Sequence, residues 1–207
     1  MGELDVLDWR RAVHALYAEV RRAPTPEAGW NLWRRGRDRL FRTHAASPIA
    51  PCDRAAHRGV PVFDYDPGYR FLVGIQPVAG ALAEEADLGP DGLIRLRPLF
   101  RTVGLAARLG AELTAYWIDA YGGDLFVPFL DAGADRYSYQ SGRYLIDTVK
   151  GADLGDEGGR FDFNFAYHPS CYYDPRWICP LSPATNYLPE IVVAGECLAA
   201  ANAVAAG

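Results

Sequence analysis

The segment from Phe161 to Glu196 constrains the fold more than any other part of this chain. It carries five prolines, at positions 169, 175, 180, 183 and 189, which remove backbone donors and exclude a long helix. It is also too polar for a plain buried strand, so it is typical of irregular backbone that presents side chains at a site. The side chains of chemical interest are Asp162, Asn164, Tyr167, His168, Cys171, Cys179, Asn186 and Glu196.

Length and charge exclude several classes of protein. The chain fits a single domain, which we expect to span residues 1–207. A net charge of −5 argues against a nucleic-acid-binding protein, since these normally carry a basic excess. No apolar run is long enough to span a membrane, and the acidic N-terminus does not resemble a secretory signal. We therefore expect a cytoplasmic protein whose four cysteines are mostly reduced.

Residues 1–45 are predicted to form a helical arm of two helices. Apolar residues at helical spacing predict the first helix over residues 4–22. The second is expected to begin after Thr25, a natural N-cap, with Pro26 at the first helical position, and to run to about Thr43. Its arginines predict a solvated basic face, with an anion-binding or acidic-partner face as the alternative.

After His44 the pattern changes to short apolar runs with a period of two, which predicts strands. Gly and Asp turns join these runs without intervening long helices, so antiparallel pairing is favoured. The expected fold is mainly β, of the α+β class: an antiparallel barrel-like or sandwich domain over residues 55–198, with two N-terminal α-helices packed on the outside. The expected strands are residues 60–65, 69–78, 93–100, 112–118 and 125–130. Residues 198–207 predict a terminal helix.

The chain lacks the signatures of classical nucleotide binding and serine hydrolysis, namely GxGxxG, the P-loop and GxSxG. Cys171 and Cys179 do not form the CxxC knuckles of a four-cysteine zinc site. Asp162 and His168 could complete a mixed metal site, but buried free thiols fit the proline-bounded loop better. Two alternatives stay open for these cysteines: a disulfide between them, or a nucleophilic Cys171 with His168 as its base. We expect no bound metal and two free thiols close in space.

Other residues of this region predict a polar pocket. Asp162 and Asn164 alternate with phenylalanines, which on a strand turns the acid and the amide to one face, as an ordinary edge strand also does. Arg143, beside the bend permitted by Gly142, could bind a carboxylate of a substrate or of the protein. Glu196 closes an apolar run, where a carboxylate is easily half buried and its pKa raised. We expect Asp162, Asn164, Arg143 and Glu196 to converge on one cavity.

The run LFVPFLDA…YSYQSGRYL…FDFNFAYHPSCYYDPRWICPLSPATNYLPEIVVAGE resembles the domain-of-unknown-function family 1684. Members share a PFRDATSG-like turn, a TYGxGRYL segment and a closing LDFNxAYNPxCAYxxxxxCPLPPxxNxLPxxIxAGE pattern. The resemblance is tightest from Leu125 onward and implies a shared fold and polar pocket, without an agreed activity. This chain has His168 where the family has Asn, and Cys197 where it has Lys. Both are reactive groups, which favours a specialised member, for instance in secondary metabolism.

We therefore expect a small-molecule enzyme that performs acid–base chemistry in a polar, aromatic-lined pocket, by hydrolysis, elimination, cyclisation or isomerisation. Asp162 and Glu196 are expected to act as acid or base, and His168 as a proton shuttle. The groups expected to hold an anionic substrate are Arg143 as its clamp and Tyr139, Asn164 and Tyr167 as orienting residues.

Alternative functions stay open. A non-catalytic ligand-binding or sensor barrel would have a cavity without titratable pairs within proton-transfer distance. A flavin-binding barrel would be yellow when purified, although we expect no cofactor. A partner module that uses the arginine-rich helix would expose a large apolar patch. A homodimer is also left open.

Overall fold

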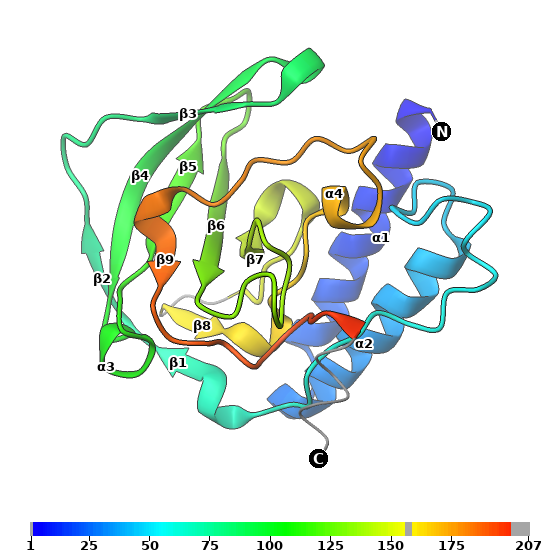
Figure 1. Cartoon of the computed structure of the whole chain (residues 1–207), viewed down its shortest axis with the longest axis horizontal. Helices are drawn as coiled ribbons and strands as arrows, with labels where there is room; N and C mark the ends of the chain where they lie inside the picture. Colours follow the sequence, from blue (N-terminus) through cyan, green and yellow to red (C-terminus); the bar gives the residue numbers. More distant parts are fainter. Residues whose placement is uncertain (1, 156–158, 200–207) are drawn as a thin grey trace.

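A helical hairpin packs beside a β-rich body in the computed structural model, which describes residues 2–155 and 159–199 (Figure 1). The hairpin consists of α1 (Glu3–Arg21) and α2 (Pro26–Thr43), so both predicted helices are confirmed. The side chain of Thr25 caps α2, because its hydroxyl accepts the N–H of Ala28 at 3.1 Å. The expected terminal helix lies, apart from residues 198 and 199, outside the described residues.

The body is built around a seven-stranded sheet. Its strands pair in the order β2-β4-β5-β6-β7, all antiparallel, while β3 pairs with β4 and β9 runs parallel to β6. A separate two-stranded sheet joins β1 to β8. The strands are β1 (Arg70–Leu72), β2 (Gly74–Pro77), β3 (Glu84–Asp87), β4 (Leu93–Val103), β5 (Thr114–Ile118), β6 (Asp124–Asp131), β7 (Arg143–Asp147), β8 (Arg160–Asp162) and β9 (Tyr187–Leu188).

Short helices connect these strands. The α-helical ones are α3 (Ala106–Leu109) and α4 (Ser170–Tyr173), and the 3-10 helices are η1 (Pro67–Tyr69), η2 (Gly89–Asp91), η3 (Thr148–Lys150), η4 (Phe163–Phe165) and η5 (Ala184–Asn186). The predicted α+β class with two N-terminal helices is thus confirmed. Among the described residues the sheets do not close into a barrel, because β2 and β7 end the strand path without pairing to each other. The barrel-like or sandwich detail is therefore not confirmed.

Three sequence-based strand assignments need correction. Residues 69–78 form two strands in place of one, because β1 ends at Leu72 and pairs with β8, whereas β2 begins at Gly74 and pairs with β4. Residues 60–65 form no strand, and only Val62 pairs, by a single bridge to Glu196. The alternation at Phe161 predicts a strand through Phe165, but β8 ends at Asp162 and η4 follows. The cause is local: the Asp162 carboxylate accepts the backbone N–H of residue 164 at 3.1 Å and caps the 3-10 turn.

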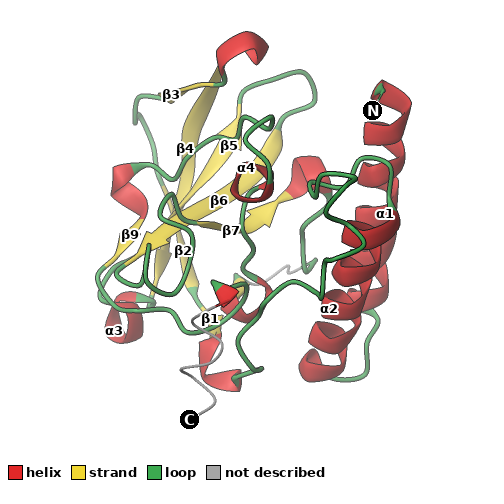
Figure 2. Ribbon diagram, turned by 45° about the vertical axis from the view of Figure 1, so that its right-hand side comes forward, coloured by secondary structure: helices red, strands yellow, loops and turns green. Residues whose placement is uncertain are grey.

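One core connects the hairpin to the body. Trp33 and Phe41 of α2 belong to the same buried cluster as Tyr144 of β7 and Tyr167. Trp33 is fully buried, and its indole N–H donates to the Tyr17 hydroxyl of α1 at 3.0 Å. Figure 2 shows α1 and α2 side by side against one side of the sheet-containing body. The hairpin therefore shares its apolar surface with the body, and it brings α2 within reach of the C-terminal segment.

Gly195 fixes the backbone on which Glu196 is presented. It has φ +75°, and a Cβ added there would lie 2.5 Å from the carbonyl oxygen of Ala166 and 2.7 Å from that of Phe163. The neighbouring backbone is held on both sides, because Phe63 N–H donates to Gly195 O and Glu196 N–H donates to Ala166 O. Only a residue without Cβ fits this conformation and this approach.

We predict that Gly195→Ala lowers the free energy of unfolding by about 1–3 kcal/mol more than Gly80→Ala. Gly80 is a matched control, since its φ is +72° and nothing lies within 4 Å of an added Cβ. Both variants pay the cost of a left-handed alanine, about 1–2 kcal/mol, but only the first adds the clash with backbone oxygens. Urea unfolding of both variants measures the difference, and equal losses would contradict the close approach.

Candidate functional site

A buried ion pair lies between α2 and the C-terminal segment. Arg37 Nε donates to Glu196 Oε1 at 2.6 Å, and Arg37 Nη2 contacts the same oxygen. Glu196 is 0% exposed and Arg37 is 8% exposed, so both charges are largely removed from water. The guanidinium also lies over the rings of Trp33, Phe41 and Tyr167, with 5.4, 4.8 and 4.9 Å from Cζ to the ring centroids.

The second carboxylate oxygen of Glu196 accepts two more hydrogen bonds. The backbone N–H of His168 donates to Oε2 at 2.7 Å, and the Tyr173 hydroxyl donates to it at 2.8 Å. Burial raises the pKa of Glu196, while Arg37 and these donors lower it and leave a net upward shift. A carboxyl group with a raised pKa, held between a cation and a phenol, is equipped to exchange a proton.

His168 is a neutral group in this site. Its Nε2 accepts the backbone N–H of Tyr139 at 3.1 Å, so the ring proton is assigned to Nδ1. Burial, followed by the positive charges of Arg143 and Arg37, lowers the pKa of His168 well below 6.5. Nδ1 is buried, lies 3.8 Å from Glu196 Oε2 and has no hydrogen-bond partner among the described residues. His168 is thus a neutral donor without an acceptor, whereas a proton shuttle needs a pKa near the working pH.

A small cavity of about 30 Å³ lies beside these groups, between α1, α2 and the body. Half-exposed side chains at Trp9, Lys150 and Ser170 contribute to its wall. The other lining residues are Val13, Tyr17, Arg37, Phe41, Pro48, Ala152, Tyr167, His168 and Tyr173. Aromatic and polar side chains thus both contribute to the wall, and the cavity has room for one water-sized group.

A second carboxylate, that of Asp147, is hydrogen-bonded to Tyr167, which lines this cavity. The Tyr167 hydroxyl donates to Asp147 Oδ2 at 3.1 Å, and Lys150 Nζ lies 3.0 Å from the same oxygen. Asp147 is 3% exposed, so the carboxylate of this ion pair is buried. Burial followed by the Asp147 charge raises the pKa of Tyr167 well above 10.0, so its hydroxyl stays protonated at neutral pH.

Arg143 lies behind the site and binds only protein groups. Its Nη1 donates to the carbonyl oxygens of Ala194 at 2.5 Å and Glu196 at 3.1 Å. Its Nη2 donates to Val192 O at 2.9 Å and to Asp131 Oδ2 at 2.8 Å. The Arg143 side chain is 0% exposed, so its carboxylate partner in this structure is Asp131 and the surrounding contacts fix the C-terminal segment.

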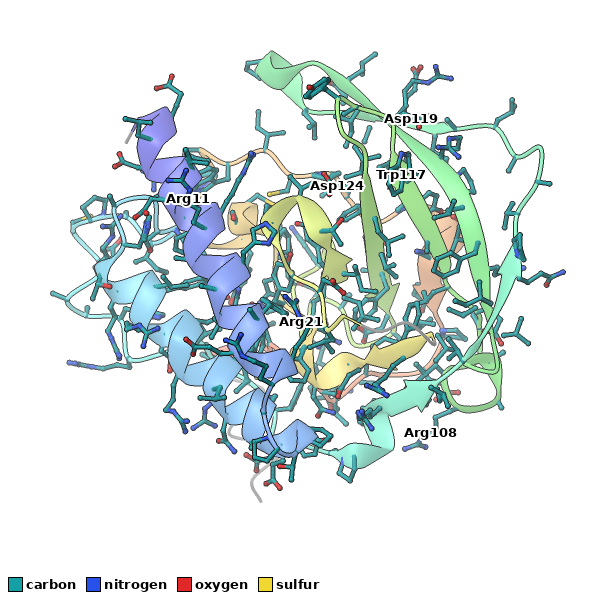
Figure 3. The ribbon with its side chains drawn as sticks, turned by 180° about the vertical axis from the view of Figure 1, so that it is seen from behind. Arg11, Arg21, Arg108, Trp117, Asp119 and Asp124 are labelled. Carbon is teal, nitrogen blue, oxygen red and sulfur yellow. The ribbon has the colours of Figure 1, made fainter. Side chains whose placement is uncertain are left out.

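Asp162 and Asn164 lie at a different place. The Asn164 side chain donates to Asp162 Oδ1 at 2.8 Å and to Asp66 O at 2.9 Å, while Arg70 Nε lies 3.6 Å from Asp162 Oδ2. Burial raises the pKa of Asp162, partly offset by Asn164 and Arg70. Asp162 lines a cavity of about 190 Å³ near the turn between α1 and α2, together with Arg21, which Figure 3 labels at the end of α1.

The structure thus separates residues that the sequence pattern groups together. His168 and Tyr167 line the small cavity, Glu196 lies behind its wall and accepts the backbone N–H of His168, and Tyr139 donates its backbone N–H to His168. Asp162 and Asn164 lie at the second cavity, and Arg143 is enclosed by protein, so the expected convergence of Asp162, Asn164, Arg143 and Glu196 is not observed. Sequence reasoning missed the cavity-lining residues Tyr17, Arg37, Lys150 and Tyr173, and it also missed Asp147, which is bonded to the lining residue Tyr167. The available signals were that Lys150 is the single lysine of the chain and that the run Arg37-Asp38-Arg39-Leu40-Phe41 also fits the pattern of the family that the sequence resembles.

Cys171 and Cys179 lie side by side, as predicted. The two thiols are close enough for each to shift the pKa of the other, and both cysteines are free. Among the described residues, no cluster of three or more His, Cys, Asp or Glu side chains could hold a metal ion. None of the helices in the described part of the chain combines the length and apolar character needed to cross a bilayer.

We predict that Arg143→Met lowers the free energy of unfolding by about 3–5 kcal/mol, because Asp131 would remain buried without its cation. Arg35→Met is the matched control, since Arg35 is an exposed arginine on α2, and its effect should stay within about 0.5 kcal/mol. Chemical unfolding of both variants tests this. A loss below about 1 kcal/mol for Arg143→Met would show that the enclosed guanidinium is dispensable.

We also predict that wild-type stability falls more steeply below pH 6.5 than that of His168→Asn. With the pKa of His168 depressed in the folded chain, only the unfolded chain binds a proton just below 6.5, so stability is present above this pH and lost as pH falls. The difference between the two slopes is at most about 1.4 kcal/mol per pH unit. Urea unfolding between about pH 7 and about pH 5 measures it. Identical slopes would mean that folded His168 takes up the proton.

Comparison with known proteins gives a family but no activity. Residues 55–197 match the family described as "Protein of unknown function (DUF1684)". The chain is also similar to an uncharacterized protein of Haloarcula marismortui with a solution NMR structure. The identity is 32%, the match covers 80% of this chain and 90% of that chain, and the TM-score is 0.55. No curated protein matches.

Proposed function

We propose a small-molecule acid–base enzyme as the function of this chain, which belongs to the DUF1684 family of proteins of unknown function. The reaction would take place at the cavity between the helical hairpin and the body. The observation that carries the proposal is the unpartnered Nδ1–H of His168, which is buried in the wall of that cavity. A buried donor without an acceptor is costly, so it favours a site that a ligand or water completes.

Other donors support an electron-rich ligand. The Tyr17 hydroxyl accepts the Trp33 indole N–H at 3.0 Å, which leaves its own proton to donate, and burial keeps that proton in place by raising the pKa of Tyr17. Lys150 stays charged: burial is the largest influence and lowers its pKa, but the charge and hydrogen bond of Asp147 and the neighbouring Cys179 together leave a net upward shift. Together with His168 these groups would bind the oxygen of a carboxylate or carbonyl group, which fits the proposed anionic substrate.

Proton transfer would use two tyrosine–carboxylate couples. Tyr173 lines the cavity and donates to Glu196, and Tyr167 lines it and donates to Asp147. In each couple a substrate proton can pass to the phenol oxygen as the phenol proton moves to the carboxylate, so the buried acid acts through its tyrosine. Glu196 is therefore the proposed base, with Tyr173 as the group that contacts the substrate.

The volume of the cavity sets the size of the reacting group. About 30 Å³ admits one water-sized group, so only the reacting end of a substrate would enter, with the remainder near the half-exposed Trp9 and Lys150. A flavin ring draws no support from this cavity, since small-molecule sites usually measure about 300 Å³ or more. Secondary metabolism and a cytoplasmic location remain part of the proposal, as does the absence of nucleic-acid partners.

A non-catalytic ligand-binding module is the second candidate. The observation that favours it is that both carboxylates are already ion-paired, Glu196 with Arg37 and Asp147 with Lys150. Ion pairing stabilises the charged forms and weakens a carboxylate as a base. The two candidates differ in a measurable way, because only the enzyme accelerates proton exchange of its ligand.

We predict that the protein binds short 2-oxo acids and catalyses exchange of their C3 hydrogens with deuterium in D₂O. The probe is 2-oxobutanoate, and proton NMR follows the loss of its C3 signal. Tyr173→Phe should bind the probe but exchange it roughly 10²- to 10⁴-fold more slowly, since the relay to Glu196 is broken. Tyr69→Phe is the control, because Tyr69 is a buried tyrosine outside the cavity whose hydroxyl donates to Ile191 O.

The outcomes separate the candidates. Binding with equal exchange rates in wild type, Tyr173→Phe and Tyr69→Phe would support the binding module. An absence of both binding and exchange for 2-oxo acids and simple carboxylates would contradict the proposed substrate class. A rate loss in Tyr69→Phe as large as that in Tyr173→Phe would assign the effect to general packing.

A further inference from the structure

The paired cysteines form a site that the proposed reaction does not use. Cys171 lies in α4, and Cys179 lies in the loop that follows it. Both are half-buried free thiols, and the Cys171 thiol interacts with the Cys179 sulfur. The loop is held beside β7, because the Tyr144 hydroxyl donates to the carbonyl oxygen of Pro180 at 2.6 Å. Two thiols are thus kept adjacent by a fixed backbone without a bond between them.

The surroundings favour a thiolate at Cys179. The Cys171 thiol lowers its pKa most, burial opposes this, and the Lys150 ammonium and the backbone N–H groups of Cys171 and Ser170 lower it further, to about 6. The opposite shift falls on Cys171, whose pKa the same interaction raises. The pair therefore favours one thiolate that shares the proton of the other thiol, and the nearby Lys150 ammonium and backbone N–H groups favour Cys179 as that thiolate.

Cys179 is also reachable from solvent. It lines a surface cavity of about 220 Å³ together with Glu84, Leu96 and Pro183. A small uncharged reagent fits such a space, whereas the carboxylates on β3 disfavour an anionic one. The other two cysteines lack this combination, since Cys197 is 1% exposed and Cys52 lies on the surface, outside the pair.

We propose that Cys179 is a hydroperoxide-reactive thiolate and that Cys171 is its resolving partner. The Cys179 sulfur attacks the distal oxygen of the hydroperoxide; the O–O bond breaks, and the leaving alkoxide or hydroxide takes a proton to become an alcohol or water. Cys171 sulfur then attacks the resulting sulfenic acid; the S–S bond forms, the S–O bond breaks, and water leaves with the Cys171 proton. Two thiols and one hydroperoxide thus give a disulfide, an alcohol or water, and a further water, with two electrons passing to the peroxide.

The disulfide would change the neighbouring reaction site. It would tie α4, which carries Tyr173, to the loop at Pro180, and it would remove the thiolate beside Lys150. Lys150 would then keep Asp147 as its carboxylate partner. Oxidation of the pair would therefore change the cavity in two ways: it would shift the position of α4, and it would alter the charge around Lys150.

The test uses the full-length, reduced protein and hydrogen peroxide as the probe. After one equivalent of peroxide, trypsin should release the peptide ending at Arg176 joined by a disulfide to the peptide beginning at Trp177, since cleavage falls between the two cysteines. The second peptide also contains Cys197, so fragmentation of the linked peptides in the mass spectrometer should place the bond on Cys179. In Cys171→Ser, dimedone should trap a sulfenic acid on Cys179. The labelling is done at about pH 6, where an ordinary thiol of pKa about 8.5 is almost fully protonated. In Cys171→Ser, Cys179 should then carry at least about tenfold more dimedone than Cys52 of the same molecules.

Matched variants decide the roles of the two thiols. Cys52→Ser should form the disulfide at the wild-type rate, whereas Cys179→Ser should show at least about tenfold less dimedone on Cys171 than Cys171→Ser shows on Cys179. Treated wild-type protein without the linked peptides would overturn the proposal, and this measurement needs no variant to fold. Equal labelling of Cys179 and Cys52 in Cys171→Ser would also overturn it.

Discussion

The buried ion pair between Arg37 and Glu196 is the interaction on which the rest of the site depends. It joins residues 159 positions apart and holds α2 against the C-terminal segment. Removing two charges from water is costly, and removing one partner alone would leave the other uncompensated, at about 3–5 kcal/mol. The pair persists because Glu196 also accepts the His168 N–H and the Tyr173 hydroxyl, so its acceptor sites are occupied. The same contacts bring the imidazole and the phenol to one cavity wall.

Local signals allowed the sequence to predict much of the fold. The Thr25 cap and the apolar spacing of the first 43 residues predict both helices, because capping and amphipathic burial act over a few residues. The strands β4, β5 and β6 follow from alternation between clear turns, whereas β7 and β9 were not predicted. The open sheet could not be predicted, since whether β2 and β7 meet depends on twist and curvature summed over all strands. At residues 162–165 the sequence alternates as in a strand, but the Asp162 side chain caps a 3-10 turn there, so η4 forms instead.

The site was predictable only in part, for a related reason. His168, Glu196 and Tyr167 lie within the unusual proline-rich segment and were identifiable from it. Arg37 and Tyr17 look like ordinary members of amphipathic helices, and no sequence pattern tells which arginine among many turns inward. Asp162 illustrates the reverse error: its neighbours in sequence are site residues, but its hydrogen bonds to Asn164 assign it to a turn. Proximity in sequence does not establish a shared cavity when the backbone reverses between residues.

The residues matched by the family begin at position 55, whereas Arg37 precedes them. The helical hairpin therefore supplies the cation, Arg37, that pairs with the buried Glu196 of the matched segment, and it packs into the same core. A β body expressed without it would bury a carboxylate with no cation, so we expect the two parts to unfold in one cooperative transition. The same dependence links the evolution of both ends of the chain: we expect a change at position 37 to need a compensating change at position 196, so that the two positions covary among relatives that keep the hairpin.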